Sequence, residues 1–258
     1  MEKNNNFIIS YNENAYMPVD TTISFEQKLR DTAKDLRATY GLPLIIMNQE
    51  IIAGKNMKFL NLIRVLYPEY ELILPAGFDY VTHYKSIMAV TLIRRDALGS
   101  YRVIKLDEEL PNRVCYVAAE IKGIGDVRVL NTHIVQTQNF AHQADWYICE
   151  RKRLQQHQWE KIHNELHYIR DLKVVMGGDF QESKNSPNLN KIKEDEYVIS
   201  GASGTKTVRN NFFNEESCID HIILSASCRA AFGNDTEIIY DNSGVGKYSD
   251  HTLLCLCS

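Results

Sequence analysis

The sequence predicts an α/β protein in which two sheets pack against each other and helices cover them on the outside. Strand candidates outnumber helix candidates, and four of them follow one another with little helix between them. Of the 258 residues, 44% are apolar and 24% are charged, which leaves enough apolar material for a sizeable core. No internal repeat, low-complexity tract or linker rich in Pro and Ser divides the chain. We therefore expect residues 1–258 to form a single domain.

The expected strands are apolar runs bounded by polar or glycine-containing segments. A strand that is covered on both faces reads as a continuous apolar run, as Leu172–Met176 does. Two of the strands, joined through Gly123–Gly125, have the pattern of a hairpin. The expected strands are, in order, Phe7–Tyr11, Leu42–Met47, Tyr70–Leu74, Ser86–Arg94, Val114–Lys122, Val127–His133, Leu172–Met176, Cys218–Ser225, Glu237–Tyr240 and Thr252–Cys257.

Three helices are expected among these strands. The first begins near Ser24, because Ser24 and Gln27 have the spacing of a capping box. The second covers Asn56–Leu66, and the third covers His142–Ile169. The polar segment Gly201–Glu216 is rich in Gly, Ser, Thr and Asn, and we expect it to be a loop.

Charge and cysteine content restrict the class of protein. The formal net charge of -4 argues against a protein coated in positive charge, although it leaves room for a local basic cleft. The six cysteines are not spaced as CxxC pairs, and Cys255 and Cys257 share one face of the last strand, as buried thiols do. The first residues lack the apolar segment of a signal peptide, and no run is long enough to span a membrane. We expect a cytoplasmic monomer without integral membrane association.

Polar residues recur where the expected strands meet loops. In VVMGGDFQES, Val174–Ser183, an apolar run ends at two glycines and Asp179 follows at once. Each such residue alone fits an ordinary turn, but together they indicate one site at the ends of the strands. The strand-end residues are Asn12, Glu50, Asn131, His133, Asp179, Gln181, Asp220, Asp250 and His251.

The chemistry of this set points to a hard metal ion and to phosphate. Carboxylate and amide oxygens with few cysteines suit Mg²⁺ or Mn²⁺ rather than zinc. Glu50 with Asp250 would suffice for Mg²⁺, which takes one or two carboxylates and keeps several waters. His251 beside Asp220 would make a general base that a carboxylate orients. Such a set fits hydrolysis of a phosphate ester.

Six short motifs occur in order along the chain. They are SYN at Ser10–Asn12, QE at Gln49-Glu50, NTHI at Asn131–Ile134, GGDF at Gly177–Phe180, IDHIILS at Ile219–Ser225 and SDH at Ser249–His251. Together they resemble the endonuclease/exonuclease/phosphatase superfamily, related to DNase I, and they run from residue 10 to residue 251. The resemblance implies a four-layer αββα sandwich and metal-dependent hydrolysis of phosphodiesters or phosphomonoesters.

The resemblance also implies a role for each matched residue. Glu50 would be the main metal ligand, with Asn12 and Asp250 helping directly or through water. His251 would act as base or contact the phosphate, and Asp220 would fix its tautomer. Asp179 would orient or deprotonate the attacking water.

Two positions carry information about the branch of the family. His133 would face the phosphate from the opposite side, as oxyanion donor or as acid to the leaving group. A histidine there is more similar to the DNase I, sphingomyelinase and inositol-phosphatase branches than to abasic-site endonucleases, which have tyrosine. Gln181 departs from the family, which usually has asparagine; the amide is kept on a longer side chain.

Other polar residues give weaker signals. Lys206, Arg209 and Lys247 lie in loops that would border the site and could grip phosphates, or could simply be solvated. Tyr80, Tyr84 and Lys85 precede a strand and could reach a substrate. The HNELH segment at His163–His167 lacks the spacing of a zinc protease, and we expect a polar, exposed helix there.

The leading hypothesis is therefore a Mg²⁺- or Mn²⁺-dependent phosphodiesterase or nuclease that acts on DNA or RNA. A phosphatase or phosphodiesterase for a small or lipid-linked phosphate, such as a phosphoinositide or sphingomyelin, is the alternative. A third class is a binding or regulatory member of the same fold with little catalysis. A basic groove with exposed aromatic residues would favour nucleic acid, and a deep closed pocket would favour a small substrate.

Overall fold

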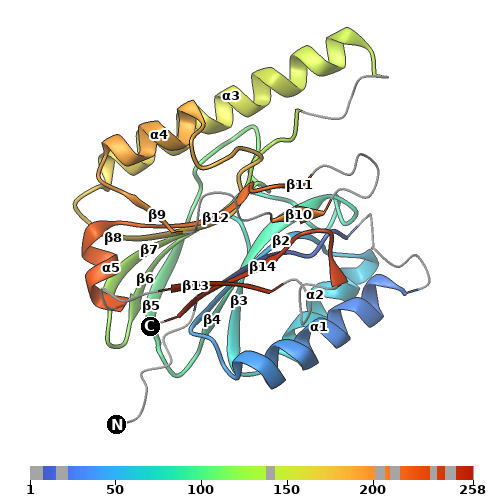
Figure 1. Ribbon diagram of the computed structural model, residues 1–258. Helices are drawn as coiled ribbons and strands as arrows, with labels where there is room; N and C mark the ends of the chain where they lie inside the picture. The colour runs from blue at the N-terminus through green and yellow to red at the C-terminus, as the bar shows by residue number, and fades with distance from the viewer. Residues whose placement is uncertain are drawn as a thin grey trace.

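Two six-stranded sheets pack face to face between two layers of helices. The computed structural model describes residues 8–15, 23–137, 143–200, 207–209, 216–232, 237–241 and 248–257. Figure 1 shows α1 (Phe25–Tyr40) and α2 (Lys58–Leu66) covering one sheet and α3 (Asp145–Tyr168) and α4 (Pro187–Glu194) covering the other. The predicted four-layer αββα sandwich is confirmed.

The first sheet has the strand order β13-β14-β1-β2-β4-β3. β1 is parallel to β2 and antiparallel to β14, so the first and last strands of the sequence lie side by side. Its strands are β1 Ile8–Asn12, β2 Ile45–Ile52, β3 Tyr70–Ile73, β4 Ile87–Arg94, β13 Glu237–Asp241 and β14 Leu253–Cys257.

The second sheet has the order β5-β6-β7-β8-β12-β9. The predicted hairpin is β6–β7, and β8 is parallel to β7 and antiparallel to β12. Its strands are β5 Leu98–Ile104, β6 Val114–Ile121, β7 Gly125–His133, β8 Lys173–Asp179, β9 Val198–Ser200 and β12 Asp220–Leu224.

Five α-helices lie outside the sheets in the described part of the chain. α1 begins where the capping pattern predicts, because the Ser24 hydroxyl accepts a hydrogen bond from the Gln27 backbone N–H. A short 3₁₀ turn over Lys55–Met57 precedes α2. The helices are α1 Phe25–Tyr40, α2 Lys58–Leu66, α3 Asp145–Tyr168, α4 Pro187–Glu194 and α5 Ala226–Phe232. None of the helices in the described ranges is long and apolar enough to cross a membrane.

Alternation along the strands builds three apolar layers. Ile8 of β1 faces the space between the two sheets, whereas its neighbour Ile9 faces α1 and α2. Val175 of β8 likewise faces the first sheet, whereas Val174 and Met176 pack toward α3 and α4. Because the central strands are covered on both faces, their sequences read as the continuous apolar runs from which they were predicted.

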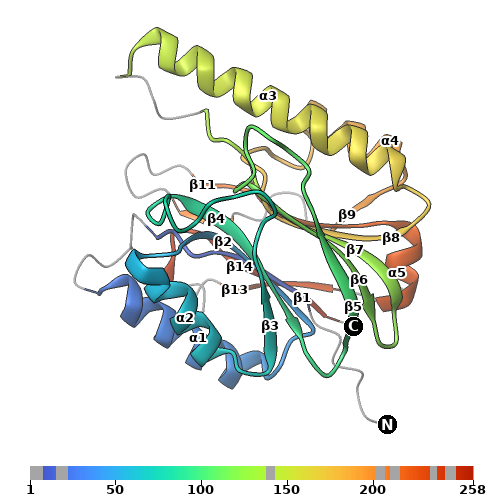
Figure 2. The same ribbon diagram turned by 180° about the vertical axis from the view of Figure 1, so that it is seen from behind.

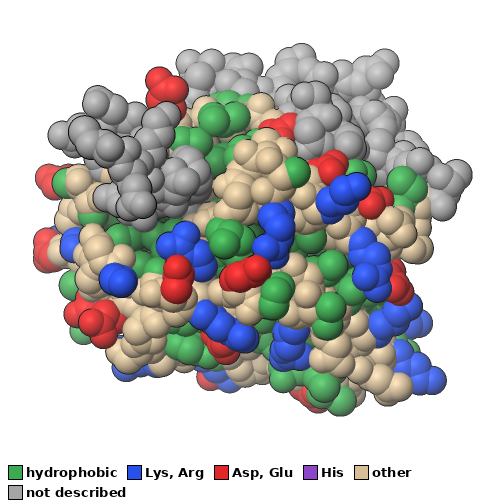
Figure 3. Space-filling view, turned by 90° about the horizontal axis from the view of Figure 1, so that it is seen from below, with side chains coloured by type: hydrophobic (Ala, Val, Ile, Leu, Met, Phe, Trp, Pro, Cys, Tyr) green, Lys and Arg blue, Asp and Glu red, His purple; other side chains and the backbone are tan. Residues whose placement is uncertain are grey.

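The outer face of the α1 and α2 layer mixes charges of both signs. Figure 3 shows basic and acidic side chains interspersed there, and Glu26 pairs with both Arg30 and Lys58. Arg37 forms a further pair with Glu69. A nucleic acid would find no single-sign field on this face.

Two expectations about irregular segments are wrong. The expected loop Gly201–Glu216 contains β10 Val208–Arg209, which pairs with β11 Glu216–Ser217. The second strand does not end at Met47 but continues to Ile52 across a register shift after Asn48. A bulge leaves extra residues out of the ladder, so polar residues interrupt the pairing without ending the strand.

Several elements were not predicted from the sequence. β5 is an edge strand whose middle residues are exposed, so it lacks a continuous apolar run. β9, α4 and α5 are short, although α4 carries a readable start signal in Ser186 followed by Pro187.

The double glycine at the end of β8 lets this strand pack tightly on two sides. A Cβ at Gly177 would meet the flexible side chain of Met47 in the other sheet. A Cβ at Gly178 would overlap the backbone oxygen of Thr132 in β7, and Gly178 has a φ of 146°. Only the second contact involves atoms that cannot move without breaking the sheet.

We predict that Gly178→Ala destabilises the fold by more than about 3 kcal/mol, because backbone must shift and φ is unfavourable. Gly177→Ala should cost about 1–2 kcal/mol, because the Met47 side chain can adopt another rotamer. Urea denaturation monitored by circular dichroism measures both. Equal losses in the two variants would contradict this account.

Candidate active site

The site residues come together at one end of the two sheets. Asn12 ends β1, His133 ends β7 and Asp179 ends β8. The sheet register places Asp179 opposite His133 on one side and opposite Asp220 on the other. His251, just before β14, forms a bridge with Val208 of β10, and its ring contacts Asp220 of β12 in the second sheet. Residues far apart in the sequence thus meet as the strand-end pattern predicts.

Asp179 lies at the centre of this group and is fully buried. Its Oδ1 accepts a hydrogen bond of 3.0 Å from the Gln181 backbone N–H. Its Oδ2 accepts bonds from Gln181 Nε2 at 2.7 Å and from Asn12 Nδ2 at 3.1 Å. The ring nitrogens His133 Nε2 and His251 Nε2 each lie 3.8 Å from the same oxygen. Gln181 has therefore kept its place beside the aspartate, on a backbone with φ of 55°.

Burial raises the pKa of Asp179 to about 7. The charge of His251 opposes this rise, whereas the negative charges of Asp220 and Glu50 reinforce it. The carboxylate consequently has an unusually high affinity for a proton near neutral pH.

His251 is oriented by Asp220. His251 Nδ1 lies 3.0 Å from Asp220 Oδ2 and 3.1 Å from Oδ1, so the Nδ1 proton is donated to the carboxylate. The Thr207 hydroxyl accepts from the backbone N–H groups of Ile219 and Asp220, which fixes the start of β12. Burial alone would lower the pKa of His251, but the charge and hydrogen bond of Asp220, with the charges of Asp179 and Asp250, hold it well above 6.5.

His133 is held in the opposite electrostatic state. Arg113 Nη1 lies 3.0 Å from His133 Nδ1 and 3.4 Å from Nε2. Because a guanidinium has only donors, Nδ1 accepts, and the neutral ring carries its proton on Nε2. Burial lowers the pKa of His133 well below 6.5, and the charges of Arg113, His251 and Arg151 lower it further. Nε2 faces Glu50 Oε1 at 3.6 Å and Asp179 Oδ2 at 3.8 Å.

Arg113 was missed in the sequence, although a signal for it exists. It stands directly before β6, and Asp250-His251 likewise stand within three residues of the start of β14. Among the described residues, no carboxylate lies within ion-pair distance of its guanidinium, which is partly buried beside the site. A cation so placed attracts anionic groups of a substrate.

The orientation of Asn12 follows from a backbone contact. Its Oδ1 accepts from the Asn14 backbone N–H at 2.9 Å, and a backbone N–H can only donate. The amide nitrogen must then face the site, where it lies 3.3 Å from Glu50 Oε1 and 3.4 Å from His251 Nε2. In this arrangement Asn12 acts on the carboxylates as a donor.

Two overlapping groups could hold a metal ion. Ligand atoms of Glu50, His133 and Asp179 lie within 4.8 Å of one another, as do those of Asp179, Asp220 and His251. Burial raises the pKa of Glu50 because it disfavours the charged carboxylate, and a bound cation would offset that cost. The donors are mainly carboxylate oxygens without cysteine, so the residues present fit a hard divalent ion.

Asp250 is not part of either group. Its Oδ1 accepts from Asn14 Nδ2 at 2.6 Å and from the Ser249 hydroxyl at 3.4 Å. Asp250 does act on the site electrostatically, because its charge contributes to the raised pKa of both Glu50 and His251.

Asn131 is buried between the sheets. Its amide nitrogen donates to the backbone oxygens of Asn48 and Val90, and its oxygen accepts from Gln49 Nε2 at 2.7 Å. With these contacts to the first sheet, the side chain braces the two sheets below the site.

The three cationic candidates from the loops are not placed beside the site by the structure. Lys206 and Lys247 lie outside the described residues, and of Arg209 only the backbone, in β10, is described. Tyr80, Tyr84 and Lys85 lie between β3 and β4, where Lys85 Nζ is 6.0 Å from the centre of the Tyr84 ring.

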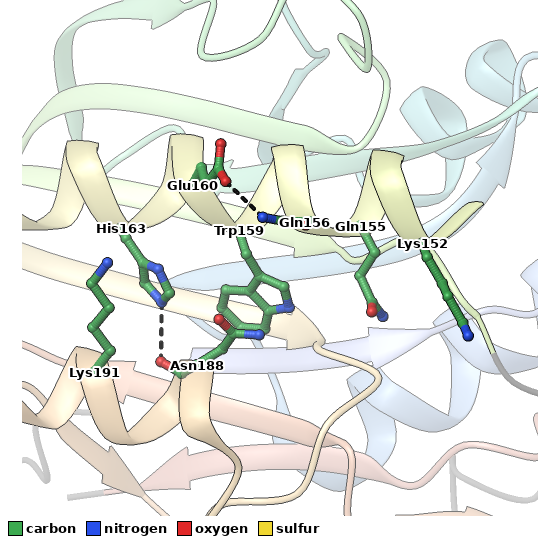
Figure 4. Close-up of a pocket in the computed structure, with 8 residues that line it drawn as sticks. All are labelled: Lys152, Gln155, Gln156, Trp159, Glu160, His163, Asn188 and Lys191. Carbon is green, nitrogen blue, oxygen red and sulfur yellow. Dashed lines mark hydrogen bonds between the residues drawn. The ribbon is translucent and has the colours of Figure 1, made fainter. Parts of the chain in front are cut away.

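The HNELH segment has separate partners for its two histidines. His163 is buried, contrary to the expected exposed helix face, and its Nε2 lies 3.0 Å from the Asn188 backbone oxygen in α4. His167 Nδ1 lies 2.8 Å from Asp195. Figure 4 shows His163 beside Trp159 on α3, where α3 faces α4. Both residues line a surface cavity of about 410 Å³. None of the residues that line this cavity belongs to either of the two groups that could hold a metal ion.

Solved structures match the chain over nearly its whole length, although no protein-family model and no curated protein matches it. An endonuclease/exonuclease/phosphatase from Bacteroides vulgatus is 16% identical, with a TM-score of 0.64 and coverage of 97% of both chains. The 3'-5' exonuclease NExo from Neisseria meningitidis is 14% identical, with a TM-score of 0.66, covering 97% of this chain and 98% of that one. This is the DNase I-like fold. TDP2 from D. rerio, complexed with single strand DNA product, is 14% identical, with a TM-score of 0.60 and coverage of 97% of both chains.

The DNase I-like fold confirms the resemblance that the ordered motifs indicated. At these identities the likeness concerns the fold, and the roles of individual residues rest on the geometry described above. In this DNase I-like chain, the strand ends of both sheets supply the site.

The segment after β1 also carries a buried carboxyl group, Glu13, next to the site. Glu13 is 1% exposed, and its Oε2 has no hydrogen-bond partner among the described residues. Burial raises its pKa to about 7, although the charge of the buried Lys28 opposes the rise. Lys28 Nζ donates to the backbone oxygens of Glu13 and Asn14, which anchors this segment to α1.

Glu13 should make stability depend on pH. An unfolded chain releases this proton near pH 4.5, whereas the folded chain keeps it until about pH 7. The folded state thus binds more protons between these values, so its stability falls as the pH rises, by up to about 3 kcal/mol. The Glu13→Gln side chain cannot ionise, so this variant should not lose stability in this way. Its free energy of unfolding should therefore rise relative to that of the unmodified protein between pH 5 and pH 8. Urea denaturation with a chelator present measures the difference, and a difference that stays constant with pH would contradict the assignment.

Proposed function

We propose that the chain is a divalent-metal-dependent phosphodiesterase that acts on nucleic acid, and that it works as a cytoplasmic monomer. The observation that carries the proposal is the placement of Asp179. It is buried between two histidines in opposite electrostatic states, and it belongs to both groups that could hold a metal ion.

The ion we propose is Mg²⁺ or Mn²⁺, held chiefly by Glu50. Asp250 would assist through its negative charge, which acts on Glu50. Asn12 would assist through its amide nitrogen, which donates to the Glu50 carboxylate. Such an ion would neutralise charge on the phosphoryl oxygens. The oxygen-rich donors and the raised pKa of Glu50 support this choice.

Asp179 is the base in the mechanism we propose. A pKa near 7 gives its carboxylate the proton affinity that a general base needs at neutral pH. Gln181 and Asn12 hold both carboxylate oxygens, so the base is oriented before substrate binds. The attacking water would lose its proton to Asp179 as its oxygen forms the bond to phosphorus and the P–O bond to the leaving alcohol breaks. The leaving oxygen would take a proton from solvent water.

The two histidines contact the phosphate in this mechanism. His251, with its pKa held high by Asp220, offers a charged donor at Nε2. His133, neutral with a proton on Nε2, offers an uncharged donor from the side of Glu50. Charge that develops on the phosphoryl oxygens would meet both donors already in place.

The proposal is tested by hydrolysis assays with Mg²⁺, Mn²⁺ or a chelator. The panel is single-stranded DNA, duplex DNA, RNA, a phosphoinositide, sphingomyelin and bis(p-nitrophenyl) phosphate. We expect metal-dependent cleavage of nucleic acid. Cleavage of the lipid phosphates alone would select the alternative substrate class, and no cleavage of any substrate would leave a binding protein of this fold.

Replacing site residues should lower activity, whereas replacing a residue elsewhere should not. Asp179→Asn and His251→Ala should each lower kcat by about 10²–10⁴-fold, because base and phosphate contact are lost. His167→Ala is the matched control, since this histidine is exposed and bonds only outside the site. Circular dichroism checks the fold of each variant. A His251→Ala variant with unchanged kcat would remove this residue from the mechanism.

Gln181→Ala should lower kcat about tenfold and move the acidic limb of the pH–rate profile to higher pH. Its Nε2 hydrogen bond favours the charged form of Asp179, so its loss raises the pKa of the base. Gln181→Asn is the control that keeps an amide and tolerates the positive φ. If Gln181→Ala and the unmodified protein share one pH–rate profile, the amide does not act on Asp179.

A further inference from the structure

Hydrogen bonds hold α3 against the backbone of residues 133–136, and this places the first turns of the helix near the site. Gln158 bonds the backbone of His133 and Val135 at 3.1 and 3.0 Å, and Gln155 Nε2 bonds the Val135 oxygen at 2.9 Å. Arg151 Nε bonds the Gln136 oxygen at 2.6 Å. These residues follow one another along a single helical face. The helix therefore runs from His133 outward toward its own N-terminus.

The first turns of α3 carry a cation and two aromatic rings in a row. The Arg151 guanidinium lies 5.9 Å from the centre of the Tyr147 ring. The Trp146 ring meets Tyr147 edge-on, with centroids 5.9 Å apart and an interplanar angle of 88°. Trp146 is 72% exposed, which is unusual for the largest aromatic side chain. Figures 1 and 2 show these first turns reaching past the main body of the sheets.

The row is continuous with the site. Arg151 and Tyr147 are close enough to Arg113 to act on its pKa, and Arg113 contacts His133 directly. The order outward from the phosphate position is therefore His133, Arg113, Arg151, Tyr147 and Trp146. Cations stand nearest the site and an open aromatic face stands farthest from it.

We propose that the first turns of α3 bind a single-stranded segment of the nucleic-acid substrate, with an unstacked base on Trp146 and backbone phosphates toward Arg151 and Arg113. This inference rests on the proposed function and specifies its substrate. Arginines followed by aromatic residues suit a single strand, because phosphates meet cations while bases stack on rings. A duplex would offer Trp146 only bases that are already stacked on one another.

The helix itself supplies a matched control. Tyr168 at the opposite end of α3 is 84% exposed and is also aromatic, but it lies far along the helix from Arg151. Loss of an exposed aromatic ring from α3 is therefore common to Trp146→Ala and Tyr168→Ala. Only the first variant removes a ring that is continuous with the site.

Binding is measured by fluorescence anisotropy of a labelled 12-nucleotide single strand and of a blunt duplex, using the Asp179→Asn protein with Mg²⁺. We expect Trp146→Ala to weaken single-strand binding about tenfold, as loss of one stacked base does, and Tyr168→Ala to leave it unchanged. Duplex binding should change less than single-strand binding. In the active protein, kcat/KM for single-stranded DNA should fall about tenfold more than that for bis(p-nitrophenyl) phosphate.

Equal single-strand affinities of Trp146→Ala and Tyr168→Ala would overturn the inference, as would equal losses for DNA and for the small ester. Failure of the proposed function has a different signature. The unmodified protein would then hydrolyse nothing, while binding of the single strand would still depend on Trp146.

Discussion

The buried carboxylate of Asp179 is the constraint on which the site depends. A carboxylate removed from water must find donors, and here they come from both sheets. Asn12 reaches it from the first sheet, and Gln181 reaches it from the second. Because Gly177 has no side chain, Met47 of the first sheet fits against it, and the sheets lie close enough for these bonds. The site is therefore a product of how the two sheets pack, and it cannot exist on either sheet alone.

The two histidines show how one cluster maintains opposite charge states a few ångströms apart. Both are buried, and burial by itself disfavours the charged form of each. The difference comes from the neighbour at Nδ1, which is the Asp220 carboxylate for His251 and the Arg113 guanidinium for His133. The group that contacts Nδ1 thus decides whether each imidazole ring is a charged acid or a neutral hydrogen-bond donor.

Much of the fold could be predicted because its central strands have simple causes. Strands such as β8 are covered on both faces, so they appear as apolar runs, and Ser24 marks the start of α1 by capping it. The missed elements lack a long apolar run: β5 is exposed at an edge, and α4, although Ser186 caps it, is short and polar. The hydrophobic pattern of a sequence predicts elements that are buried. It does not predict elements such as these, which depend on contacts with neighbouring elements.

The sequence predicts which residues form the site better than it predicts how their side chains are oriented. Strand-end position selects Asn12, His133 and Asp179, because the topology gathers those ends. The direction of the Asn12 amide depends on the Asn14 backbone, and the bracing by Asn131 depends on the distance between the sheets. Neither feature can be predicted from the neighbouring residues in the sequence. The adjacency of β1 and β14 has a consequence for folding. His251 stands just before β14, so it is held against Asp220 only once β14 has paired with β1. A folding intermediate in which β14 is unpaired would therefore lack this contact.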